Sequence, residues 1–88
     1  MAKIGVVGTG YVGLVAAACF AELGHEVICI DNDAAKIEAL LAGKVPIHEK
    51  FLPELLERHR GARLNFSRSL PDAVSSSQVI FIAVGTPQ

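Results

Sequence analysis

Residues 5–20 read GVVGTGYVGLVAAACF and place three glycines, Gly8, Gly10 and Gly13, between two apolar runs. The residues before the first of these glycines, Ile4–Val7, form a short β-branched run that is typical of a buried strand. After the glycines the apolar residues recur three and four positions apart, which indicates a helix. The stretch therefore predicts a strand, a tight turn and a helix, with glycines where the backbone of the turn must come close to another group.

The rest of the chain continues this alternation of strands and helices. Apolar runs predict strands at residues 4–7, 26–30, 63–67 and 78–84. Helical spacing and cap residues predict helices that begin at Tyr11, after Asp33, near Leu52 and after Ser69. Strands that alternate with helices are parallel and are joined by right-handed crossovers. We therefore expect an α/β fold, a Rossmann-like half-domain with a parallel sheet of about four strands in the order 3-2-1-4, flanked by helices.

Two of these elements carry expectations about burial. The first helix is expected to bury the face formed by Val12, Val15, Ala16, Cys19, Phe20 and Leu23. The last strand is apolar throughout, which is typical of a strand covered on both faces, but as the last strand of a half-sheet it would be an exposed apolar edge. Cys19 and Cys29 are both expected to be reduced, buried, small hydrophobic residues, which indicates a cytoplasmic location.

The residues Gly8-Thr9-Gly10-Tyr11-Val12-Gly13 fit the dinucleotide-binding pattern G-x-G-x-x-G. The pattern alone is weak, but its position between a strand and a helix strengthens it. Gly8 permits the tight turn, Gly10 lets a pyrophosphate approach the backbone, and Gly13 lets the helix pack closely on the sheet. The start of the helix then offers free N–H groups and a partial positive charge to the phosphates.

Asp31 lies 18 residues after Gly13, at the end of the second predicted strand. Its carboxylate would accept hydrogen bonds from the adenosine ribose hydroxyls and would repel a 2′-phosphate, which favours NAD over NADP. Lys36, one turn into the next helix, lies either near the ribose or on an exposed face. Asp33 is interpreted as the cap of that helix.

Gly85 and Thr86 follow the fourth predicted strand. In the order 3-2-1-4 this strand is the neighbour of the first, and ligands bind in the crevice at the carboxyl ends of such a pair. Thr86 is therefore either a hydroxyl donor to the cofactor or an ordinary turn residue. No pattern predicts a catalytic centre or a metal site, since His25, His48 and His59 lack the spacing of metal ligands.

Composition limits the partners of the chain, which has 88 residues and a formal net charge of −1. This balance predicts neither a nucleic-acid partner nor binding to an anionic membrane. Each apolar run is interrupted before the ~20 residues of a membrane span. The basic residues at 58–60 and 63 are interpreted as a solvated helix end. Because 51% of so short a chain is hydrophobic, we expect residues 1–88 to be a fragment of a longer protein, and the glycine motif with Asp31 predicts that this fragment is an NAD-binding domain.

With these residues in place, the chain resembles the UDP-glucose/GDP-mannose dehydrogenase family over essentially all of its length. The form G-x-G-Y-V-G, which fixes Tyr11 and Val12, is more specific than the general pattern. Two further blocks match in the same order, IDND--K-EAL--GKVPIHE at residues 30–49 and VIFIAVGTP at residues 79–87. One departure is EKFL at residues 49–52, where members of the family commonly have EPGL.

The resemblance implies an enzyme that oxidises UDP-glucose to UDP-glucuronate in two NAD-dependent steps, and we expect it to be a homo-oligomer. It implies that the glycine turn with Val12 binds the pyrophosphate, that Asp31 and Lys36 lie beside the adenosine ribose, and that Thr86 lies near the nicotinamide. It also implies that the catalytic cysteine, lysine, asparagine and glutamate of the family lie beyond this chain. We therefore expect the chain alone to be inactive.

Two alternatives stay open from the sequence. The first is another NAD-dependent dehydrogenase, of the 6-phosphogluconate or hydroxyacid type, because the same half-domain serves those enzymes. The second is a regulatory domain without enzymatic activity, for which NAD is a signal. Both retain the glycine turn and Asp31, so these residues do not separate them from the leading hypothesis.

Overall fold

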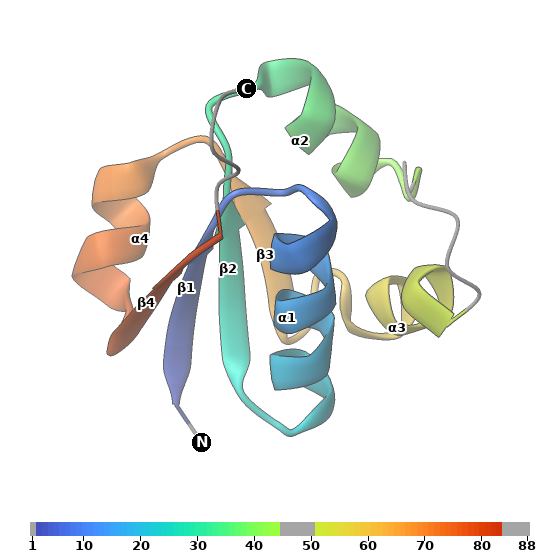
Figure 1. The fold of residues 1–88 in the computed structure, drawn as a ribbon, viewed down its shortest axis with the longest axis horizontal. Helices are drawn as coiled ribbons and strands as arrows, with labels where there is room; N and C mark the ends of the chain where they lie inside the picture. The colour runs from blue at the N-terminus through green and yellow to red at the C-terminus, as the bar shows by residue number, and fades with distance from the viewer. Residues whose placement is uncertain (1, 45–50, 84–88) are drawn as a thin grey trace.

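Four parallel strands form one sheet in the computed structural model, which describes residues 2–44 and 51–83 (Figure 1). The strands are β1 (Lys3–Val7), β2 (Glu26–Ile30), β3 (Leu64–Ser67) and β4 (Val79–Ile82). The helices are α1 (Tyr11–Glu22), α2 (Ala34–Leu41), α3 (Phe51–His59) and α4 (Leu70–Ser76). The sheet order is β3-β2-β1-β4. The predicted fold class and strand order are therefore confirmed.

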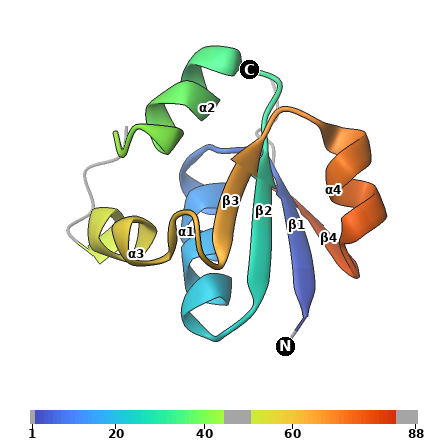
Figure 2. The same ribbon diagram turned by 180° about the vertical axis from the view of Figure 1, so that it is seen from behind.

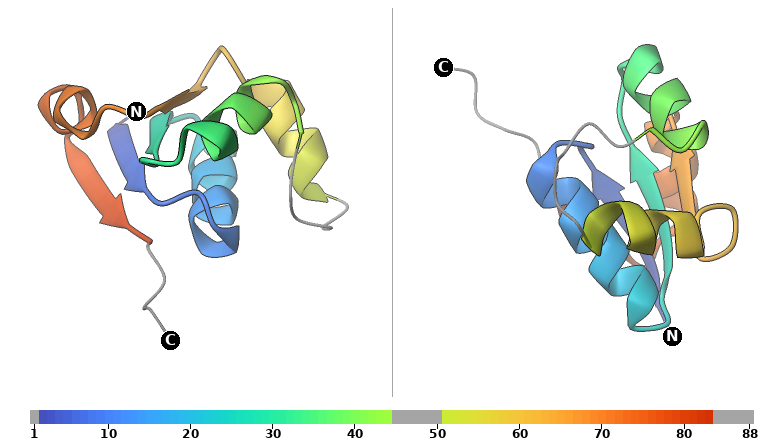
Figure 3. Two further views of the ribbon diagram at one scale, coloured as in Figure 1. Left: turned by 90° about the horizontal axis from the view of Figure 1, so that it is seen from above. Right: turned by 90° about the vertical axis from the view of Figure 1, so that its right-hand side faces the viewer.

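Helices cover both faces of the sheet. Seen from above, α1 and α3 lie on one side and α4 lies on the other (Figure 3). The view from behind shows β3 at one edge of the sheet and β4 at the other (Figure 2). Val7 pairs with Ile30 on one side and with Ile82 on the other, so the carboxyl ends of β1, β2 and β4 lie level.

The core lies between the sheet and the side that carries α1. Its largest fully buried side chains come from both strands and helices: Val6, Leu14, Cys29, Leu52 and Leu64. The burial of Cys29 was predicted, and desolvation raises the pKa of its thiol to about 12. Leu52 belongs to α3, so this helix is joined to the same core rather than lying apart from it.

The predicted buried face of α1 is wrong in part, because only Val15 and Phe20 of its members pack, partly buried, against the core. The helix instead buries Gly13, Leu14, Ala17, Ala18 and Ala21, while Val12 and Leu23 are 62% and 74% exposed and Cys19 is also exposed. Apolar residues surround the whole of this helix, so their spacing alone does not choose a face. The face that packs is the one with small residues, because these let the helix axis come close to the strands.

The expectation of an exposed apolar edge is confirmed at β4, and the expected cover on both faces is absent within the described residues. Val79, Phe81 and Ile82 are exposed, because β4 pairs only with β1 and α4 packs mainly over β1 and β2. The ring of Phe81 makes an edge-to-face contact with Phe20 of α1, with centroids 5.8 Å apart. The apolar composition of β4 is therefore matched by packing only in part.

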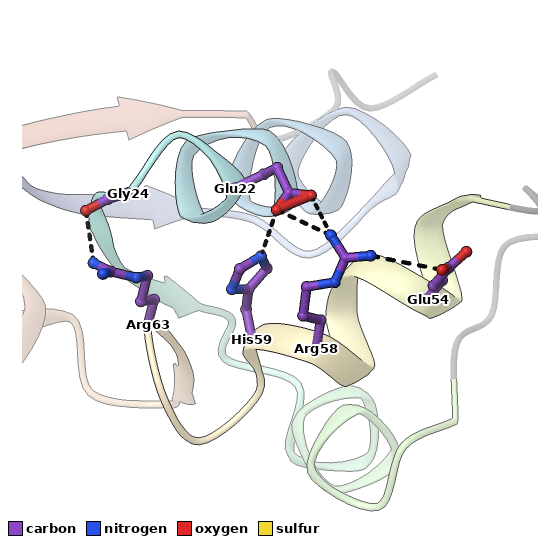
Figure 4. A network of polar contacts seen from close by, with 6 residues as sticks. All are labelled: Glu22, Gly24, Glu54, Arg58, His59 and Arg63. Atoms are coloured by element: carbon purple, nitrogen blue, oxygen red, sulfur yellow. Dashed lines mark hydrogen bonds and ion pairs between the residues drawn. The ribbon is translucent and has the colours of Figure 1, made fainter.

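A polar network joins the end of α1 to α3 (Figure 4). Arg58 donates to both carboxylate oxygens of Glu22, at 2.7 and 3.1 Å, and His59 Nε2 lies 3.2 Å from Glu22 Oε1. Arg63 donates to the carbonyl oxygen of Gly24 at 2.8 Å. Hydrogen bonds from His59 and Arg58 lower the pKa of Glu22. Arg58 and His59 thus lie in the last turn of α3 as predicted, and the same residues also pair with Glu22 at the end of α1, which the sequence did not predict.

Candidate functional site

The glycine turn connects β1 to α1 at the carboxyl edge of the sheet. Gly8 has a φ of 111°, a conformation that strongly favours glycine, and its N–H donates to the carbonyl oxygen of Ile30 at 2.8 Å. This hydrogen bond ties the turn to the end of β2. A Cβ atom on Gly13 would collide with the carbonyl oxygen of Gly8. The predicted close packing of the helix at Gly13 is therefore confirmed.

Gly10 is the N-cap of α1, and its position is open. Its φ and ψ of −74° and −172° are accessible to any residue, and a Cβ atom built there would meet nothing within 4 Å. The cap has no side chain that could accept from the first turn, and that turn contains no acidic residue. The N–H groups and the positive end of the helix dipole therefore face a space that a phosphate can enter.

The next two residues of the motif are exposed at the start of α1, Tyr11 by 47% and Val12 by 62%. A pocket of about 420 Å³ lies between the glycine turn and α2. It is lined by Thr9, Gly10, Tyr11, Ala35, Lys36, Ala39 and Leu40. The turn and α2 thus form two walls of one hollow, and Lys36 is in the wall opposite the turn.

The carboxylate of Asp31 lies between the glycine turn and the start of α2. Its Oδ2 accepts from the Thr9 hydroxyl at 2.6 Å and from the Thr9 N–H at 3.2 Å, and its Oδ1 accepts from the Asp33 N–H at 2.9 Å. Partial burial raises the pKa of Asp31, but these hydrogen bonds and the charge of Lys36 outweigh it, so the pKa is lowered overall. Asp31 is therefore held as an anion at the edge of the sheet.

Asp33 caps α2, as predicted. Its Oδ1 accepts from the N–H groups of Ala35 and Lys36, at 3.0 and 3.3 Å. The cap holds the start of α2 beside Asp31, because the Asp33 N–H donates to that carboxylate. Lys36 consequently lies in the first turn of a fixed helix, and its charge acts on Asp31.

A second pocket, of about 240 Å³, opens at the carboxyl ends of β1 and β2. Its lining is Val7, Gly8, Ile30, Asp31, Asn32, Arg68 and Leu70. The apolar part suits a flat ring, while Asp31 and Arg68 place opposite charges at its margin. Sequence reasoning missed Asn32, Arg68 and Leu70. Arg68 follows directly after β3, beside the end of β2, and the predicted strand order was the signal that could have found it.

Sequence reasoning also missed Thr9. The motif G-x-G-x-x-G leaves this position variable, but Thr9 is 3% exposed and bonds to Asp31. The predicted site residues Gly85 and Thr86 lie outside the described residues.

Within residues 2–44 and 51–83, no group of three or more His, Cys, Asp or Glu side chains could hold a metal ion. No helix in the same residues has the length and apolar character needed to cross a membrane.

The structure thus brings together Gly8, Gly10, Tyr11, Val12, Gly13, Asp31 and Lys36 at one edge of the sheet. The uncapped start of α1 can bind an anion, and the Asp31 carboxylate can accept a hydrogen bond from a hydroxyl group. The glycine turn between them leaves room for a ligand. The hydroxyl of Thr9 lies next to a base, the Asp31 carboxylate, but Thr9 is buried, so this pair does not offer an accessible nucleophile to a ligand in either pocket. The chemistry of the site is binding and orientation.

Comparisons with known proteins agree with this geometry. Residues 2–88 match the family model described as the NAD binding domain of the UDP-glucose/GDP-mannose dehydrogenase family. The chain is 50% identical over 88 residues to the UDP-glucose 6-dehydrogenase TuaD of Bacillus subtilis, covering 99% of this chain and 19% of that protein. The chain therefore spans about a fifth of the length of this relative.

Solved structures give the same result. A UDP-glucose dehydrogenase from Pyrobaculum islandicum superposes with a TM-score of 0.88 at 45% identity, over 99% of this chain and 20% of that one. A GDP-mannose dehydrogenase from Pseudomonas aeruginosa, solved as a ternary complex, superposes with a TM-score of 0.87 at 44% identity, over 96% of this chain and 20% of that one. The two values are too close to separate the two sugars.

Proposed function

Because this chain belongs to the UDP-glucose/GDP-mannose dehydrogenase family, as its NAD-binding domain, we propose that residues 1–88 supply the cofactor site of a nucleotide-sugar dehydrogenase. The observation that carries the proposal is the uncapped start of α1 beside the anionic Asp31. An open helix start accommodates a pyrophosphate, and a fixed carboxylate accommodates a ribose hydroxyl. No other described helix combines these two features.

Each residue of the site has a role in this proposal. Gly8, Gly10 and Gly13 shape the turn, and the first-turn N–H groups of α1, beginning at Tyr11 and Val12, bind the pyrophosphate. Asp31 accepts a hydrogen bond from the adenosine ribose. Lys36 lies beside Asp31, and its positive charge balances that of the carboxylate. Gly85 and Thr86 would contact the cofactor on the nicotinamide side.

The bound cofactor would supply the hydride acceptor, and this chain's residues hold and orient it. The apolar pocket with Asn32, Arg68 and Leu70 suits the adenine ring, because it is hollow, largely apolar and adjoins Asp31. The negative charge of Asp31 beside the ribose disfavours a 2′-phosphate, so the cofactor is NAD rather than NADP.

The substrate and reaction of the whole protein are part of the proposal. They are the oxidation of UDP-glucose to UDP-glucuronate with two NAD molecules, by a homo-oligomer in the cytoplasm. The 50% identity to TuaD, named a UDP-glucose 6-dehydrogenase, favours this sugar. The catalytic groups would lie outside these 88 residues, as the resemblance to the family implies.

Titration calorimetry on the protein at its natural length tests the cofactor assignment. We expect NAD to bind at least about tenfold more tightly than NADP, the factor that corresponds to about 1.4 kcal/mol. Binding of NADP as tight as NAD would contradict the role given to Asp31. Nucleotide sugars are compared in a separate assay, in which two NADH per UDP-glucose are expected and faster turnover of GDP-mannose would overturn the substrate.

A further inference from the structure

Thr9 is a buried polar residue within the glycine turn. It is 3% exposed and is the one polar residue in the buried class among residues 2–44 and 51–83. A buried hydroxyl needs a hydrogen-bond partner, and that of Thr9 is Oδ2 of Asp31 at 2.6 Å. The N–H of the same residue donates to the same oxygen at 3.2 Å. Thr9 therefore donates two hydrogen bonds to the same oxygen of the Asp31 carboxylate.

These two hydrogen bonds make the two oxygens of Asp31 unequal as acceptors for a ligand. A carboxylate has about four acceptor positions, two on each oxygen. The two donors of Thr9 use both positions on Oδ2, and the Asp33 N–H uses one on Oδ1 at 2.9 Å. With respect to the described residues, one acceptor position is left, and it is on Oδ1. Asp31 lines the pocket at the carboxyl edge, so this position is the one that a ligand hydroxyl can reach.

We propose that Thr9 is a positioning residue for cofactor selection, which holds the Asp31 carboxylate so that Oδ1 accepts one hydroxyl of the adenosine ribose. The inference rests on the proposed function, because it needs Asp31 to contact the ribose. It differs from the general role of the motif, in which only the glycines and the helix start act on the cofactor. Thr9 acts on it through Asp31 alone.

The charges around Asp31 show why its position matters for choosing between NAD and NADP. Asp33 and Lys36 face it from the start of α2, and Arg68 shares its pocket from the segment between β3 and α4. If Asp31 turned away, Lys36 and Arg68 would leave a cationic surface that suits a 2′-phosphate. With Thr9 holding it, the carboxylate stays where a 2′-phosphate would have to go. Loss of the Thr9 hydroxyl should therefore relax selectivity.

The test uses Thr9→Val, which keeps the shape of the side chain and removes the hydroxyl, with Thr9→Ser as the matched control that retains it. Affinities for NAD and NADP are measured by calorimetry on the protein at its natural length. We expect Thr9→Val to weaken NAD binding about tenfold and to reduce the preference for NAD over NADP by a similar factor. Thr9→Ser should stay within about twofold of the native protein, since its donor to Asp31 is kept.

A double-mutant cycle with Asp31→Asn separates this proposal from the proposed function. If Asp31→Asn leaves NAD affinity and selectivity unchanged, the ribose role of Asp31 is wrong and both proposals fail. If Asp31→Asn changes both but Thr9→Val weakens NAD and NADP equally, Asp31 keeps its role and Thr9 is only structural. We expect Thr9→Val to have no further effect on selectivity once Asp31 is Asn, because Thr9 acts through that carboxylate.

One measurement on the native protein avoids any failure of a variant to fold. The proton of the Thr9 hydroxyl should be visible by NMR and should exchange slowly with water, because it is buried and bonded to a carboxylate. A rapidly exchanging hydroxyl proton would show that Thr9 does not hold Asp31, and would overturn the inference.

Discussion

Helices α1 and α2 both begin at the carboxyl edge of the sheet, but only the N-terminus of α2 is capped by a side chain. At α2, the carboxylate of Asp33 accepts from two N–H groups of the first turn. At α1, the cap is Gly10, which has no side chain, and the space beside it is open. A helix start that serves only the fold is completed by its own side chain. The start of α1 has no side-chain cap, and this supports the proposal that a bound ligand completes it.

The largest effect is expected from Gly13→Ala, which attacks the packing on which the open turn depends. The added Cβ would collide with the carbonyl oxygen of Gly8, so α1 must shift away from β1. We expect the free energy of unfolding to fall by about 1–3 kcal/mol, as in other overpacked interiors. Urea denaturation measures this change. A native-like midpoint would show that the turn tolerates a side chain there.

Gly10→Ser turns the start of α1 into one like that of α2. The serine fits the backbone angles and can cap the helix, so stability should be unchanged or rise by a few tenths of a kcal/mol. The same side chain fills the space proposed for the pyrophosphate, so NAD affinity should fall at least about tenfold. Calorimetry and thermal unfolding on one sample measure both. If Gly10→Ser binds NAD as tightly as the native protein, the proposal that the pyrophosphate occupies the space beside Gly10 is wrong.

Some parts of the fold and of the candidate site could be predicted from the sequence, and others could not. The glycine turn was predictable because each glycine has a separate geometric reason, and Asp33 because capping is local. The buried face of α1 was not, since Val12 and Ala17 are both apolar and only the approach of the sheet distinguishes them. The role of Thr9 needed the fold itself, because its partner Asp31 is distant in sequence. Arg68 could have been found from the predicted strand order, which places the end of β3 beside the end of β2.

Asp33→Ala is the reciprocal change, and it should affect stability alone. Loss of the cap leaves two N–H groups of α2 without a side-chain acceptor, which costs about 1 kcal/mol. The Asp33 N–H remains in place to donate to Asp31, so NAD affinity should change less than about twofold. Denaturation and calorimetry are compared as for Gly10→Ser. A large loss of NAD affinity would mean that the cap of α2 is itself part of the site.

The smallest effect concerns Asp31, which links the two helix starts, and it depends on pH. Because the folded-state pKa of Asp31 is lowered, its stabilising contribution is present above the ordinary Asp pKa of about 3.9 and is lost as the pH falls through the folded value. The difference in stability between the native protein and Asp31→Asn should be constant from about pH 7 to 5 and shrink below about pH 4. Denaturation at several pH values measures it. A difference that grows on acidification would contradict the hydrogen bonds assigned to Asp31.

The most direct test of the central claim is a crystal structure of the protein at its natural length with NAD bound. The account predicts the pyrophosphate at the start of α1, within hydrogen-bond distance of its first-turn N–H groups, and one ribose hydroxyl on Asp31 Oδ1. A pyrophosphate bound away from the first turn of α1, with Gly10 still facing open solvent, would contradict it.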